Sequence, residues 1–67
     1  METIKAVVSG RIREARKDKG LTQKEVGERM GVSESTVNQY ESGKQNLTIE
    51  TLQKLADAVG VNIKEFF

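Results

Sequence analysis

The stretch that most constrains how this chain folds is LTQKEVGERMGVSESTVNQYESGK, from Leu21 to Lys44. Its pattern predicts two short helices joined by a tight turn at Gly31. Thr22 can cap the first helix, because Glu25 follows at the three-residue spacing of a capping box. The second helix follows directly after the turn. The stretch is therefore typical of a helix-turn-helix, placed at about residues 22–41.

Glycines mark the ends of the predicted helices, because glycine readily adopts the left-handed conformation that closes a helix. Helices are expected at about residues 5–19, 23–30 and 34–41. A fourth helix can be capped by Thr48, and a short fifth one by Asn62. Four of the six glycines stand just after one of these helices: Gly20, Gly31, Gly43 and Gly60.

Apolar residues recur at helical spacing in the first and fourth helices. In the first helix they are Ile4, Val8, Ile12 and Ala15. On one face of the fourth helix they are Ile49, Leu52, Leu55, Ala56 and Val59. The residues expected to hold the helix-turn-helix together are Val26, Met30, Val37 and Tyr40. The chain is therefore predicted to be all-α, as a compact five-helix bundle.

Composition narrows the class of protein. The 67 residues predict a single domain, 1–67, and the absence of proline and the few aromatic residues argue against a β-rich one. The chain has no histidine and no cysteine, which are common as general bases, nucleophiles and metal ligands. We therefore expect no enzyme, no cofactor and no small-molecule substrate. No apolar run of about 18 residues is present, so no membrane contact is expected, and the lack of cysteine fits the cytoplasm.

Charge is distributed unevenly, although the net charge is only +1. Residues 1–24 hold seven basic and three acidic side chains, whereas residues 25–67 hold four basic and seven acidic ones. The first part of the chain can therefore face phosphate, or it can simply form a solvated helix surface of mixed charge.

Short polar side chains form the outer face of the second helix of the motif. They are Glu34, Ser35, Asn38 and Gln39. Such side chains can hydrogen-bond, so they suit a helix that reads base edges in the major groove better than one that only has to stay soluble. Gln39 can bond an adenine through two atoms. Glu34 can either accept from a cytosine or favour the N-terminus of its own helix.

Gly27 lies in the middle of the first helix of the motif, where a glycine costs up to about 1 kcal/mol relative to alanine. The apolar residues around it favour a close crossing by another helix over tolerance at a surface position. We therefore expect Gly27 to mark a tight contact.

The segment QKEVGERMGVSESTVNQYESGK resembles the helix-turn-helix of the Cro- and phage-repressor-like family, also called the Xre family. The resemblance extends to RIREARKDKGLTQ before it and NLTIETLQKLADAVGVNIKEFF after it, and covers the chain from about Ser9 onward. It implies the five-helix, lambda-repressor-like DNA-binding fold. It also implies a transcription regulator of double-stranded DNA, most often a repressor that binds a palindromic operator as a homodimer. The same fold serves antitoxins and adaptors whose main partner is a protein, and this alternative stands beside the first.

The resemblance assigns roles position by position. In the recognition helix, at about residues 33–41, it places base-reading side chains at Ser33, Glu34, Ser35 and Gln39. Thr36 and Asn38 flank them and are expected to reach a base or the DNA backbone. Contacts to phosphate are expected from Thr22 and Gln23 at the start of the motif and from Ser42, Lys44 and Gln45 after it. Arg16 and Glu41 match an ion pair between the first and third helices, although Arg16 can also be read as a phosphate contact.

Two departures from the family pattern bear on function. Gly27 stands where alanine is more usual, and the recognition helix has no arginine or lysine on its outer face. Without a bidentate contact to guanine, affinity should depend on phosphate contacts and dimerisation, and specificity on DNA shape. The dimer contact is expected at Leu47, Phe66 and Phe67. The alternative is that both phenylalanines fold back into the small core.

Overall fold

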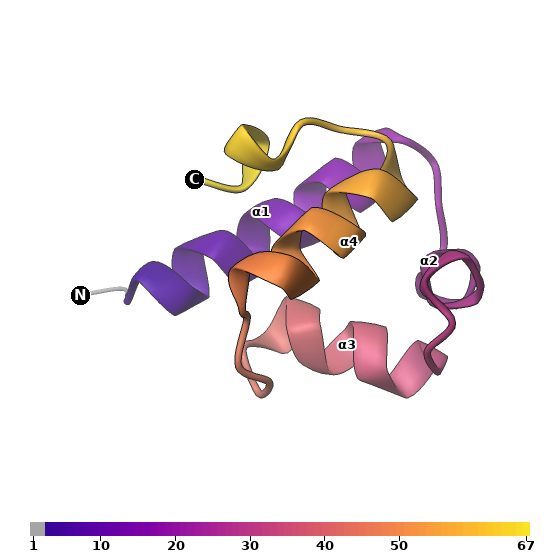
Figure 1. The fold of residues 1–67 in the computed structure, drawn as a ribbon, viewed down its shortest axis with the longest axis horizontal. Coiled ribbons are helices and arrows are strands. Elements are labelled where there is room, and N and C mark those ends of the chain that lie inside the picture. Colours follow the sequence, from indigo (N-terminus) through magenta and orange to yellow (C-terminus); the bar gives the residue numbers. More distant parts are fainter. Residues whose placement is uncertain (1–2) are drawn as a thin grey trace.

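The structure, a computed structural model, describes residues 3–67 and contains helices alone in that range. Four α-helices follow one another: α1 (Ile4–Asp18), α2 (Gln23–Met30), α3 (Glu34–Ser42) and α4 (Ile49–Val59). A single 3₁₀ turn, η1 (Ile63–Phe66), follows α4. In Figure 1, α3 lies along one edge of the molecule and η1 along the opposite edge, with α1 and α4 between them.

The last predicted helix is a 3₁₀ turn, so the expected five α-helices are corrected to four. Asn62 caps it as predicted: its side chain accepts from the N–H of Lys64, and the Glu65 carboxylate accepts from the N–H of Asn62. The turn is only four residues long. A 3₁₀ turn bonds three residues back instead of four and can close within so short a segment. The all-α fold class is confirmed.

A threonine or serine caps the start of each α-helix and accepts the N–H three residues later at 3.0 or 3.1 Å. The caps are Thr3, Thr22, Ser33 and Thr48. Each satisfies one N–H that the first turn leaves without a partner inside the helix. Gly31 ends α2 with a φ of 76°, which a residue with a side chain adopts only under strain. The predicted ends of α1, α2 and α3 are correct to within one residue.

All four α-helices and η1 contribute to the hydrophobic core. Its largest fully buried side chains are Phe66, Ile12, Leu55, Val26 and Val37. Ile4 and Ile49, which the helical spacing assigns to apolar faces, are instead 70% and 78% exposed. Each is the first residue of its helix, so both lie on an apolar helical face without belonging to the core.

The last two phenylalanines have opposite environments. Phe66 has no exposed surface, whereas Phe67 is 58% exposed. Successive residues of a helical turn point in different directions, so only one of them enters the core. Phe66 therefore offers no surface to a second subunit, and its assignment to a dimer contact is corrected. Leu47 is half-buried at the edge of the core and remains a candidate together with Phe67.

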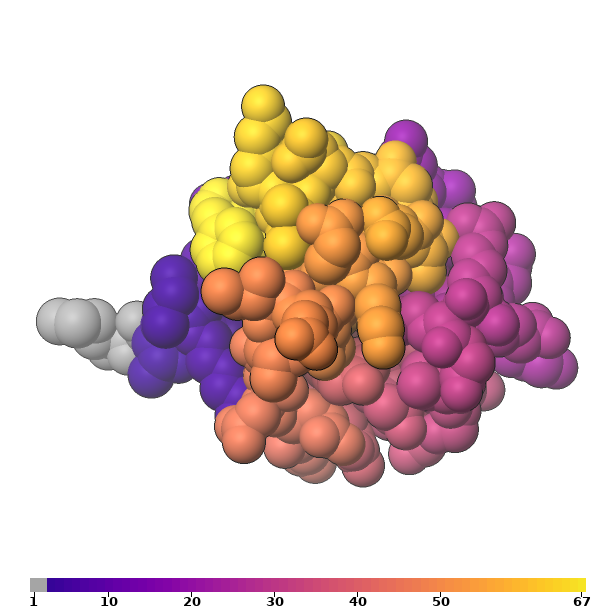
Figure 2. Space-filling model, viewed as in Figure 1, coloured from indigo at the N-terminus to yellow at the C-terminus, as the bar shows by residue number. Residues whose placement is uncertain are grey.

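An open apolar groove runs between the start of α1, the start of α4 and the C-terminal residues. The side chains that define this apolar face are Ile4, Leu47, Ile49 and Phe67. Figure 2 shows these segments meeting on one side of the molecule, in indigo, orange and yellow. The three large apolar side chains that are exposed within residues 3–67 thus gather in one place.

Gly27 lies where α2 approaches the turn that leads into α3. A Cβ at this position would lie 2.8 Å from the carbonyl oxygen of Val32 and 3.2 Å from that of Ser33. The turn comes this close because the N–H of Val32 donates to the carbonyl of Gly27 at 2.9 Å. The expected tight contact is therefore present, but the neighbour is the backbone of the turn and not another helix.

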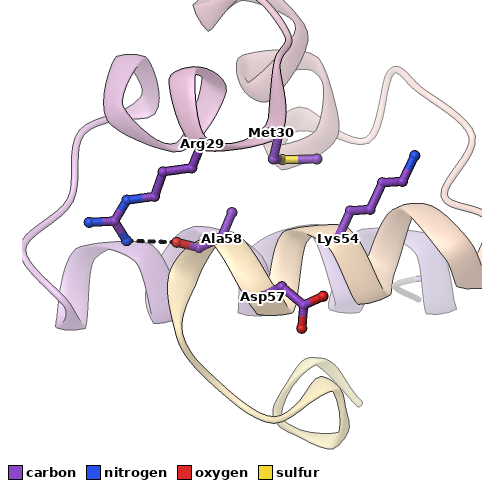
Figure 3. Close-up of a pocket in the computed structure, with 5 residues that line it drawn as sticks. All are labelled: Arg29, Met30, Lys54, Asp57 and Ala58. Atoms are coloured by element: carbon purple, nitrogen blue, oxygen red, sulfur yellow. Dashed lines mark hydrogen bonds between the residues drawn. The ribbon is translucent and has the colours of Figure 1, made fainter.

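Arg29 joins the end of α2 to the end of α4. Its Nη1 donates to the carbonyl oxygen of Ala58 at 2.8 Å, beside a hollow that Met30, Lys54 and Asp57 also line (Figure 3). Carbonyls in the last turn of a helix lack partners within the helix. The bond therefore satisfies such a group and holds the helix-turn-helix against α4. Sequence reasoning did not single out Arg29.

Candidate nucleic-acid interface

One face of α3 is open to solvent and carries most of the residues predicted to read bases. Glu34, Ser35 and Asn38 are exposed, and Gln39 is half-buried. The opposite face packs inward through Val37, which has no exposed surface. In Figure 1, α3 lies at an outer edge of the fold, where a long partner can reach it.

Gln23, the first residue of α2, is held by two side chains of α3. Its Nε2 donates to Oε1 of Glu41 at 3.1 Å, and its Oε1 accepts from Nδ2 of Asn38 at 3.5 Å. These two bonds orient the amide and leave its second N–H for a ligand. The free N–H groups in the first turn of a helix attract phosphate. The start of α2 is therefore suited to bind a phosphate beside α3.

Arg16 and Glu41 form the ion pair that the family resemblance implies. Nε and Nη2 of Arg16 donate to Oε2 and Oε1 of Glu41 at 2.6 and 3.0 Å. Nη1 donates to the carbonyl oxygen of Leu21 at 2.8 Å. The side chains of Arg16 and Glu41 are 10% and 3% exposed. The ion pair is present in the structure and leaves Arg16 little surface to offer a phosphate.

Two residues predicted to touch DNA also act as helix caps. Thr22 accepts from the N–H of Glu25, and the Glu25 carboxylate accepts from the N–H of Thr22, both at 3.0 Å. The bond from the backbone of Thr22, aided by the Thr22 side chain, lowers the pKa of Glu25 below its ordinary value. Ser33 accepts from the N–H of Thr36, and their hydroxyls lie 2.9 Å apart. A hydroxyl of Thr22 or Ser33 that contacts DNA must therefore also keep its capping hydrogen bond to the backbone.

The loop after α3 is fastened to the recognition helix at Gln39. Nε2 of Gln45 donates to Oε1 of Gln39 at 2.7 Å. Oγ of Ser42, the last residue of α3, donates to the Gln39 carbonyl at 3.3 Å. The backbone N–H of Lys44 donates to the same carbonyl at 3.0 Å, and Lys44 is exposed. Gln39 keeps a second acceptor site on Oε1 as well as its amide N–H groups. It can therefore still bond a base while it holds the loop.

Arg13, which was not among the predicted site residues, lies beside them. It lines an open hollow of about 160 Å³ whose other lining residues are Gln23, Asn38, Glu41 and Ser42. The sequence held one signal for it. Arg16 and Lys17 follow Arg13 by three and four positions, so the three basic residues share one side of α1.

Within residues 3–67, no three acidic, cysteine or histidine side chains gather closely enough to hold a metal ion. In the same part of the chain, no helix is both long enough and apolar enough to cross a membrane.

A family model described as helix-turn-helix matches residues 12–66, which include α2, α3 and α4. The chain belongs to the Cro- and phage-repressor-like (Xre) helix-turn-helix family. Members of the Xre family are DNA-binding transcription regulators, and the Xre-family protein described here is one of them.

Relatives of this Xre-family protein carry regulator names. It is 39% identical over 59 residues to the uncharacterized HTH-type transcriptional regulator y4dJ of Sinorhizobium fredii, covering 88% of this chain and 77% of y4dJ. It is 42% identical over 57 residues to the cryptic phage CTXphi transcriptional repressor RstR of Vibrio cholerae. That match covers 85% of this chain and 51% of RstR, so the chain spans about half the length of RstR.

A solved structure with a similar fold is the restriction-modification controller protein C.AhdI from Aeromonas hydrophila. The two chains superpose with a TM-score of 0.85 at 32% sequence identity. The superposition covers 92% of this Xre-family protein and 94% of C.AhdI.

Proposed function

We propose that this protein is a transcriptional repressor that inserts α3 into the major groove of an operator. The observation that carries the proposal is the exposed polar face of α3, which is bonded to α2 through Gln23 and to the following loop through Gln45. A major groove about 12 Å wide admits a helix. The name of RstR, a transcriptional repressor, supports repression. A regulator of this kind works where the DNA is, which supports a cytoplasmic location.

In this proposal, one set of side chains reads the bases and a second set binds the DNA backbone. Base edges are read by Ser33, Glu34, Ser35, Asn38 and Gln39. The DNA backbone is held by Thr22, Gln23, Thr36, Ser42, Lys44 and Gln45. Because α3 carries no basic residue, the second set supplies most of the affinity, and the first set discriminates among sequences.

We further propose that two copies bind a palindromic operator, with the apolar face as their contact. Its exposed members, Ile4, Ile49 and Phe67, come from three separate segments of the chain. A domain of this size gains from covering such a surface. In a symmetric dimer, the two half-sites would be centred about 34 Å apart, which is one turn of DNA.

Selection of bound duplexes from a randomised pool tests the proposal directly. We expect enrichment of a palindromic sequence. If no duplex is enriched, DNA reading is excluded, and an antitoxin or adaptor whose partner is a protein becomes the better account.

Two substitutions then separate base reading from phosphate binding. Ser35→Ala should relax preference at one base position and leave the salt slope unchanged, because Ser35 is exposed and forms no side-chain hydrogen bond within residues 3–67. Lys44→Ala should weaken binding to all duplexes alike and reduce the slope of log K against log salt by about 0.9 for each phosphate that is no longer neutralised. Lys64→Ala is the matched control, because Lys64 lies in η1, on the opposite edge of the molecule from α3. An equal effect of Lys44→Ala and Lys64→Ala would contradict the assignment.

A further inference from the structure

Arg13 is an exposed cation with no acidic partner in the described part of the chain. The ion pair found within residues 3–67 joins Arg16 to Glu41 and leaves Arg13 out. The residues three and four positions away on α1 are Ser9, Gly10, Arg16 and Lys17, none of them acidic. Like charges at this spacing repel each other. Among residues 3–67, no ion pair or hydrogen bond therefore accounts for a positive charge at this position.

The hollow beside Arg13 is lined with hydrogen-bond donors. The amides of Gln23 and Asn38 each keep one N–H, whereas the single O–H of Ser42 is donated to the Gln39 carbonyl. Gln23 uses one N–H for Glu41 and keeps the other. The hollow has a volume of about 160 Å³ and opens to solvent, so a phosphate group on the surface of a duplex can reach it.

Glu41 is the acidic residue that lines this hollow, and its charge is compensated. Arg16 donates two hydrogen bonds to its carboxylate, at 2.6 and 3.0 Å, and the Glu41 side chain is only 3% exposed. Because the Arg16–Glu41 pair has no net charge, the guanidinium of Arg13 makes the electrostatic potential in the hollow positive. The hollow therefore presents a positive charge and several donors to a ligand.

We propose that Arg13 and Gln23 bind one phosphate of the DNA backbone in this hollow. The proposal rests on the DNA-reading function proposed above, because Asn38 and Ser42 of α3 line the same hollow. A guanidinium can bond two phosphate oxygens at once, which fixes orientation as well as charge. Arg13 would thus set the register of α3 in the groove from α1, outside the helix-turn-helix itself.

The test compares Arg13→Ala with Arg11→Ala on the enriched duplex and on an unrelated one. Arg11 is the matched control, since it is exposed on the same helix but lines a different hollow, with Ala6, Val7, Gly10 and Glu14. Arg13→Ala should weaken binding to both duplexes about fivefold per subunit in about 0.15 M salt, and lower the salt slope by about 0.9 per subunit. Arg11→Ala should leave the salt slope unchanged.

A neutral methylphosphonate placed at single backbone positions identifies the phosphate. At one position it should weaken binding by the unaltered protein, yet cause no further loss with Arg13→Ala, as a double-mutant cycle requires for two groups in contact. Equal losses with Arg13→Ala and Arg11→Ala, or additive losses at every backbone position, would overturn the inference. Failure of the unaltered protein to enrich any duplex would instead reject the function on which it rests.

Discussion

Glu41 connects the three helices that form the interface. It lies in α3 and accepts hydrogen bonds from Arg16 of α1 and Gln23 of α2. Removing one partner of a buried ion pair leaves the other charge buried and uncompensated. Glu41 therefore both forms the buried ion pair and orients the side-chain amide of Gln23, the first residue of α2.

Arg16→Ala is expected to lower the free energy of unfolding by about 3–5 kcal/mol, because Glu41 would keep its charge in a buried site. Thermal unfolding followed by circular dichroism measures the effect. Arg11→Ala serves as the control, since Arg11 is exposed, and should melt with the unaltered protein. A normal melting temperature combined with weaker DNA binding would reassign Arg16 to phosphate.

The residue-scale contacts were predictable only in part. Arg16 and Glu41 are 25 positions apart, and nothing in their local sequence pairs them. The resemblance to a family supplied that pair. The bonds from Gln23 to Glu41 and from Asn38 to Gln23 join side chains across a turn, so they depend on how α2 is placed against α3. No spacing rule predicts them.

At the scale of elements, the turn between α2 and α3 limits what can replace Gly27. The backbone of Val32 and Ser33 occupies the space that a side chain would enter. Gly10 offers a contrast within the same fold, because a Cβ there would have no neighbour within 4 Å. A larger side chain should therefore lower the stability of the protein at position 27 and not at position 10.

Gly27→Val is expected to destabilise the protein by about 1–3 kcal/mol, because the added atoms overlap backbone that cannot rotate away. Gly10→Ala should stabilise it by about 0.5–1 kcal/mol, since alanine is the better helix former and nothing crowds it. Urea unfolding curves give both values. If Gly27→Val proved as stable as the unaltered protein, α2 and the turn could not be as close as described.

Helix ends were predictable because their signals are local. Thr22 and Ser33 cap helices, and Gly31 closes one, within a few residues of the sequence itself. Which apolar residues are covered is decided elsewhere in the chain. Ile4 and Ile49 fit the helical spacing, yet they are 70% and 78% exposed.

The whole molecule leaves one apolar face uncovered within residues 3–67. Ile4, Ile49 and Phe67 are all more than half exposed and line one groove. Association through this face would bury apolar surface without changing the core. It would also bring two copies of α3 onto one DNA, which compensates for the absence of a basic side chain on the reading face.

Ile49→Lys is expected to weaken dimerisation at least about 100-fold, since each of the two subunits loses an apolar group whose full burial contributes roughly 1.5–3 kcal/mol. Sedimentation equilibrium measures the dimer constant. Ala6→Lys adds the same charge to an exposed position of α1 outside the apolar face and should have no such effect. Finding the unaltered protein monomeric on its DNA would remove the proposed dimer.

The unequal bonding of the reading residues determines how α3 could be retargeted. Glu34 and Ser35 are exposed and form no side-chain hydrogen bond within residues 3–67, whereas Asn38 is bonded to Gln23. Gln39 is bonded in turn to the loop. A library varied only at positions 34 and 35 would change the base contacts and leave the hydrogen bonds of α3 to α2 and to the loop intact. Variation at position 38 or 39 would change one of these hydrogen bonds together with the recognised sequence.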